Sequence, residues 1–188
     1  MHKASTLKFS DALYGVMIPI VVAFLIVGIG MSASPAATGL KYTLLEAIVA
    51  VGVPMLIGLT WNRWAGGAAG FLMGSLYALY FADQVYASQG HSDISLLGNL
   101  VSAMLIGYIA GALNKRSDSY KRMLTSGVIA GLAGSIIVVY TSNFSTILGP
   151  ATIGAAATAC LPRVLAGIIV PVVARAFLRH SANSKRTE

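Results

Sequence analysis

The sequence has few charged residues and a single cysteine. Charged side chains make up 10% of its 188 residues and hydrophobic ones 56%, and the mean hydropathy is +0.77. A soluble domain carries about a quarter charged residues, so this composition predicts a membrane protein. With Cys160 alone, an internal disulfide and a multi-thiolate metal site are excluded. The three histidines, His2, His91 and His180, are far apart in the sequence, which argues against a histidine-based metal site or catalytic triad.

Signatures of catalysis and of nucleotide binding are missing as well. The sequence contains no GxxxxGK[ST] phosphate-binding loop and no clustered catalytic residues. Its net charge of +7 does not indicate a nucleic-acid partner, because the lysines and arginines flank apolar runs and form no patch interleaved with aromatic residues. We therefore expect no enzyme activity, no metal, no cofactor and no nucleic-acid binding.

Long apolar runs are what the sequence does have. A helix needs roughly 20 apolar residues to cross a bilayer, and runs of that length predict an all-α bundle of six transmembrane helices in one integral membrane domain, 1–188. The predicted spans are 12–32, 40–60, 65–83, 94–113, 123–142 and 155–178. The competing interpretation of the first run is a cleavable signal peptide, since Lys3 and Lys8 precede it.

Basic residues set the predicted orientation. Alternating the loops between the two sides leaves Lys41 on one side. The other side receives Lys3, Lys8, Arg63, Lys115, Arg116, Lys121, Arg122, Arg175, Arg179, Lys185 and Arg186. Basic loops stay in the cytoplasm, so we expect cytoplasmic N- and C-termini and a multi-pass protein of the cell membrane.

Small residues recur at helical spacing in the third, fourth and fifth predicted spans. Membrane helices associate through close backbone approach at such residues. We therefore expect these three helices to pack tightly against one another. The small residues concerned are Gly66, Gly70, Gly74, Ala103, Gly107, Gly111, Gly127 and Gly131. Prolines at Pro19, Pro54 and Pro171 fall near the middle of the first, second and sixth spans, where they kink a helix or free a carbonyl.

Two charged residues lie within the predicted spans at a similar depth. Glu46 is about five residues and Arg163 about eight residues from the outer end of their spans, roughly 8 to 12 Å deep at ~1.5 Å per residue. Charge within a bilayer usually faces a cavity or a partner, so the two side chains could pair. In the alternative interpretation, Pro162 begins a helix and Arg163 lies at the membrane interface.

Further polar residues are predicted at the same level of the outer half. Tyr77 continues the glycine face of its span, and it is joined there by Tyr80, Asn99, Tyr140 and Asn143. An apolar cavity with a few convergent polar groups is typical of small-molecule sites. We therefore predict a solute pocket open to the outside and lined by Glu46, Tyr77, Tyr80, Asn99, Tyr140, Asn143 and Arg163.

Three stretches resemble a known family. They are "RWAGGAAGFLMGSLYAL" (63–79), "VSAMLIGYIAGALNKRSDSYKRMLTSGVIAGLAGSIIVVY" (101–140) and "LPRVLAGIIVPVVARAF" (161–177). With six short-looped spans, they are similar to the substrate-binding S components of energy-coupling factor (ECF) vitamin transporters.

The resemblance implies a function and a set of partners. A vitamin or similar micronutrient would bind at the outer face, and the first three helices would dock onto a transmembrane coupling subunit driven by two ATPases. Family members often carry Ala-x-x-x-Ala in the first helix, where this sequence has Gly15, Pro19 and Ala23 at that spacing. Two alternatives stay open: a stand-alone channel or facilitator, oligomeric through the Gly66, Gly70 and Gly74 stripe, and a structural subunit of a larger membrane complex.

Overall fold

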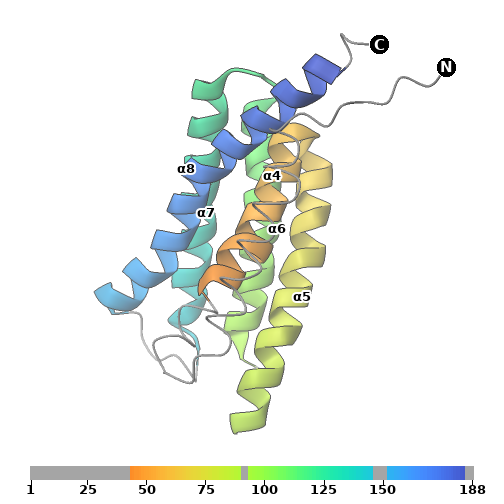
Figure 1. The fold of residues 1–188 in the computed structure, drawn as a ribbon. Helices are drawn as coiled ribbons and strands as arrows, with labels where there is room; N and C mark the ends of the chain where they lie inside the picture. The colour runs from red at the N-terminus through yellow and green to blue at the C-terminus, as the bar shows by residue number, and fades with distance from the viewer. Residues whose placement is uncertain (1–42, 90–92, 146–151, 185–188) are drawn as a thin grey trace, which may run out of the picture. The chain divides into compact units, whose positions relative to one another are not determined.

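The computed structural model describes residues 43–89, 93–145 and 152–184, and these residues form helices and turns without a strand. The chain divides into two compact units, Met1–Leu44 and Leu45–Glu188, and the account below concerns the second. Its elements are η2 (Glu46–Gly52), α4 (Val53–Thr60), α5 (Arg63–Gln89), α6 (Ile94–Asn114), α7 (Tyr120–Ser142) and α8 (Ile153–Ser184) (Figure 1). The predicted first span, with Gly15, Pro19 and Ala23, lies outside the described residues.

Four helical segments in the described part are long and apolar enough to cross a membrane. They are Thr43–Thr60, Ile94–Asn114, Tyr120–Ser142 and Ala156–Leu178, and they match the predicted second, fourth, fifth and sixth spans. Helix α5 covers the predicted third span but is not among the four. The described part of the chain is thus all-α, with four helices long and apolar enough to cross a membrane, whereas the count of six and the side of the termini stay predictions.

The second span is divided into a π-helix and an α-helix. Glu46–Gly52 has π geometry, and the Val53 N–H bonds to the Ile48 carbonyl, five residues earlier. Pro54 stands at the start of α4, where its missing N–H removes one bond of the regular α pattern. Pro54 therefore lies where the helix changes from π to α geometry.

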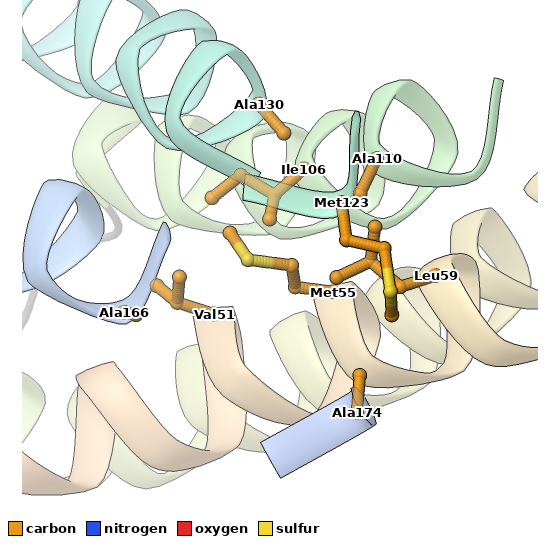
Figure 2. Close-up of a cluster of buried hydrophobic side chains, with 9 residues drawn as sticks. All are labelled: Val51, Met55, Leu59, Ile106, Ala110, Met123, Ala130, Ala166 and Ala174. Carbon is orange, nitrogen blue, oxygen red and sulfur yellow. The ribbon is translucent and has the colours of Figure 1, made fainter. Parts of the chain in front are cut away.

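Helix α5 packs on α6, α6 on α7 and α7 on α8. Helix α4 packs on α5, α6 and α8. A cluster of buried side chains lies where η2, α4, α6, α7 and α8 meet (Figure 2). Met55 and Leu59 of α4 contact Ile106 of α6 and Met123 of α7 there. Most other members are alanine, so the helices lie close together and the core is thin. The full cluster is Val51, Met55, Leu59, Ile106, Ala110, Met123, Ala130, Ala166 and Ala174.

Glycines bring the backbones of α5 and α6 into direct contact. A Cβ atom at Gly66 would lie 2.4 Å from the Gly107 carbonyl oxygen, and one at Gly70 would lie 2.3 Å from that of Ala103. A Cβ atom at Gly111 would lie 2.6 Å from the Arg63 backbone nitrogen. In this structure the stripe packs α5 on α6. Because α6 covers the stripe, the stripe does not offer a free surface to a second copy of the chain in this structure.

The glycines of α7 pack on a different neighbour from the one predicted. A Cβ at Gly127 would meet the Gly167 carbonyl oxygen at 2.5 Å, and one at Gly131 would meet the Arg163 carbonyl oxygen at 2.5 Å. Both neighbours belong to α8. Pro171 takes part, since its missing N–H leaves the Gly167 carbonyl without the usual helical donor. The expectation that the glycine stripes of all three helices face one another is therefore corrected: Gly127 and Gly131 serve the α7–α8 contact.

Polar side chains fasten the helix ends. Asp93 caps α6 by accepting a hydrogen bond from the Ser95 N–H at 2.7 Å, and its other oxygen accepts one from the Ser145 hydroxyl at 2.9 Å. At the opposite end of α6, the buried Asn114 amide donates to the Leu59 carbonyl at 2.9 Å. These contacts hold α6 to the end of α7 on one side and to the end of α4 on the other.

Adjacent glycines in α5 allow the packing to be tested. Gly66→Ala should destabilise the protein by about 1–3 kcal/mol, because the new Cβ would collide with the α6 backbone. Gly67→Ala has the same gain in helix propensity, yet its Cβ would lie 3.5 Å from the nearest atom, a carbon of Tyr108. Denaturant unfolding of the purified variants measures the difference. Equal stabilities would contradict the close contact between α5 and α6.

Candidate functional site

Arg163 is the largest fully buried side chain among the described residues, with 1% of its surface exposed. It lies more than two helical turns beyond Ile153, the first residue of α8. The alternative in which Pro162 begins the helix and Arg163 lies at the interface is therefore wrong. Within its own helix, the Arg163 Nη1 donates to the Ala159 carbonyl at 2.6 Å.

Three side chains from neighbouring elements surround the guanidinium. Its Nη2 forms an ion pair with Glu46 Oε1 of η2 and a longer hydrogen bond, 3.3 Å, with Asn99 Oδ1 of α6. Its Nε lies 3.4 Å from the Ser102 hydroxyl of α6. The predicted pairing of Glu46 with Arg163 is present, and Asn99 joins it. The guanidinium thus uses all three nitrogens, with two short contacts, to Glu46 and the Ala159 carbonyl, and two longer ones, to Asn99 and Ser102.

The supporting contacts come from α7. The Ser102 hydroxyl donates to the Gly134 carbonyl at 2.9 Å, which orients its oxygen to accept from Arg163. Gly131 packs on the Arg163 backbone, so α7 approaches closely enough for this chain of hydrogen bonds to form. Two glycines of α7 therefore help to place an arginine of α8 against a serine of α6.

The two members of the ion pair differ in exposure. Arg163 is 1% exposed, whereas Glu46 is 16% exposed. Since a buried guanidinium without an acceptor is costly, the carboxylate must stay in place or be replaced by another acceptor. Glu46 is the accessible edge of the cluster and the first residue of the π-helix.

The other residues predicted to line a pocket are distributed over different surfaces. Tyr77 is buried at 4% and packs with Ala50 and Ala103, next to the segment that carries Glu46. Tyr80 lies at the surface of α5. Tyr140 is 63% exposed, and its ring packs on Phe144. Asn143 is exposed and donates to the Val139 carbonyl of its own helix. The structure therefore brings together Glu46, Asn99 and Arg163, with Tyr77 nearby, and leaves Tyr80, Tyr140 and Asn143 at the surface.

Ser102 is a member of the cluster that the sequence prediction missed. A signal was available, because Ser102 follows Asn99 by three residues and so shares its face of a helix. Serine is common in membrane helices, however, and its hydroxyl can bond within its own helix, as that of Ser135 does to the Gly131 carbonyl at 2.8 Å. Ser102 differs from such serines because its hydroxyl lies next to Arg163, and that contact is visible only in the tertiary structure.

A hollow of about 560 Å³ lies elsewhere, between α5 and α6. Its walls are Trp64, Gly67, Ala68, Phe71, Leu72, Met104, Leu105 and Tyr108. These residues do not include any member of the predicted solute pocket. The hollow and the Arg163 cluster are therefore two separate features of the described structure.

Comparison of the chain with protein-family models, with curated proteins and with solved structures finds no match. Its class accordingly follows from its own fold and site. In its described part it is an all-α protein with four helices long and apolar enough to cross a membrane, and among them it carries a buried arginine paired with a partly exposed glutamate.

A double-mutant cycle measures the coupling of this pair. Glu46→Leu should destabilise the protein by about 3–5 kcal/mol, because it leaves a buried guanidinium without its main acceptor. Arg163→Met added to Glu46→Leu should recover part of that loss by removing the unpaired charge. Asp118→Asn, an exposed carboxylate in the turn before α7, serves as the control and should stay within about 0.5 kcal/mol of the wild type. Additive effects at Glu46 and Arg163 would show that the two side chains are not coupled.

Proposed function

We propose that the protein is a membrane-embedded binding subunit for uptake of a vitamin or similar small micronutrient across the cell membrane. The observation that carries the proposal is Arg163, a buried guanidinium held by polar side chains from η2 and α6. A charged residue within a membrane bundle is expensive and by default indicates a functional site. The solute would carry a carboxylate or another polar acceptor group.

The chemistry of the cluster supports an exchange of acceptors. Arginine presents a planar fork of donors that fits a carboxylate in a bidentate way. In this protein Glu46 contacts only one of the terminal nitrogens, and the second donates to the Ala159 carbonyl of the same helix. A solute carboxylate could take the place of Glu46 without leaving the guanidinium unpaired. The solute-free pair would then keep the charge satisfied until a solute arrives.

The π-helix provides a means for Glu46 to move. Its hydrogen bonds follow a less common pattern than those of an α-helix, and short π segments are frequent at functional sites. Because η2 carries Glu46 at one end and meets Pro54 just beyond the other, a change of local helix type would shift the carboxylate. Such a shift would open the guanidinium to a solute from the predicted outer side.

The coupling partners are proposed on the sequence resemblance. A transmembrane coupling subunit and two ATPases would supply the energy for uptake, with contacts from the first three predicted helices, including Gly15 and Ala23. The described part of the chain supplies the solute site in this proposal, and the bilayer surrounds it.

Ligand binding by the purified protein tests the proposal. A panel of vitamins is titrated into the protein in detergent, and the thermal unfolding midpoint and direct binding of labelled solute are followed. We expect at least one compound with a carboxylate or comparable acceptor to bind and to stabilise the fold. Arg163→Lys keeps the charge but loses the planar fork, so it should weaken binding by at least tenfold.

Asp118→Asn is the matched control, because it changes a carboxylate far along the chain from the cluster. It should bind like the wild type. The proposal fails if no compound of the panel binds, or if Arg163→Lys folds and binds as well as the wild type.

A further inference from the structure

The hollow between α5 and α6 is an apolar surface feature lined by side chains of both helices. Gly67 and Ala68 form a low stretch of α5 between the larger side chains of Trp64 and Phe71. Trp64, Phe71 and Leu72 are exposed by 68%, 51% and 59%. From Trp64 to Leu72 the hollow extends about 12 Å along the helix, at ~1.5 Å per residue. These dimensions suit part of one extended hydrocarbon chain.

A cation is held at one end of this hollow. The Arg63 guanidinium carbon lies 5.5 Å from the centre of the Trp64 ring and 5.9 Å from that of Tyr108. The two rings pack edge to face, with centres 5.4 Å apart, and both line the hollow. Two aromatic rings therefore keep the exposed Arg63 side chain at the mouth of the hollow through cation–π contacts.

More positive charge lies at the same end of the helices. The Arg63 backbone packs on Gly111, one helical turn before Lys115 and Arg116. The Arg116 Nε donates to the Trp61 carbonyl at 3.0 Å, which ties it to the turn that precedes α5. Asp118 is the acidic residue of the connection from α6 to α7. An apolar hollow with this basic end has the polarity of a phospholipid, with its chain in the membrane and its phosphate at the surface.

We propose that the hollow binds an acyl chain of an anionic phospholipid whose phosphate lies at Arg63. Arginine is suited to phosphate because its fork can bond two oxygens at once. Exposed tryptophan next to it is typical of the membrane interface. By the predicted orientation this is the cytoplasmic leaflet, where anionic lipids attract basic residues. The site does not depend on the solute site at Arg163.

Native mass spectrometry with two added lipids tests the site. Dioleoyl phosphatidylglycerol and dioleoyl phosphatidylcholine have the same chains and differ in net charge. We expect the wild type to bind the phosphatidylglycerol about fivefold more tightly, which corresponds to about 1 kcal/mol for one basic residue at the surface. Arg63→Gln should remove this preference, and Arg63→Lys, which keeps the charge but loses the fork, should retain only part of it.

Matched controls separate the site from general charge and surface effects. Arg175 also lies over an aromatic ring, 5.2 Å from the centre of Tyr120, but not at the hollow, so Arg175→Gln should keep the preference. Ala68→Phe should fill the hollow and weaken both lipids, whereas Ile136→Phe, on the exposed surface of α7, should weaken neither.

Several outcomes would overturn the proposal. Equal binding of the two lipids to the wild type, or the same loss in Arg63→Gln and Arg175→Gln, would exclude selection of an anionic headgroup by Arg63. Unchanged lipid binding in Ala68→Phe would exclude the hollow. If Ala68→Phe instead converted a dimer to a monomer with unchanged lipid binding, the hollow would be a contact between two copies of the chain.

Discussion

Close approach of helix backbones at small residues is the constraint on which the described structure depends. At Gly66, Gly107 and Gly131 there is no room for a Cβ atom between one helix and the next. In a bilayer, apolar side chains gain little by leaving lipid for a helix interface, so helices associate through direct contact of their backbones at such small residues. The thin core is a consequence, because alanines fill it wherever two helices lie close together and only a few larger side chains, such as Met55 and Ile106, fit between them.

The buried ion pair depends on this close packing. Ser102 and Asn99 reach Arg163 because α6 and α8 both lie against α7, one through Gly134 and the other through Gly131. A larger side chain at either glycine would separate the helices and lengthen contacts that are already 3.3 and 3.4 Å. The polar cluster and the glycine contacts are therefore one arrangement, in which packing places the hydrogen-bonding groups and the hydrogen bonds satisfy a charge within the membrane.

Much of the fold could be predicted because the bilayer limits what a sequence can do. A long apolar run must satisfy its own backbone hydrogen bonds, so it must be helical, and the segments 94–114 and 120–142 follow the prediction within a few residues. The polar site was less predictable. Depth along a span can be counted, which placed Glu46 and Arg163 at one level. The direction of a side chain around its helix cannot be counted in the same way, so Tyr140 and Asn143 were expected beside Glu46 and Arg163, whereas both lie at the surface of the described structure.

The sequence by itself determined the all-α class, most helix boundaries, the presence of small-residue contacts and the similar depth of the two intramembrane charges. These properties depend on local composition and on the length needed to cross a bilayer. The tertiary structure decided which helix each glycine faces, that Ser102 joins Arg163, and that the apolar hollow ends at Arg63. Those features require the relative rotation and approach of helices distant in sequence, which arise only when all the contacts form together.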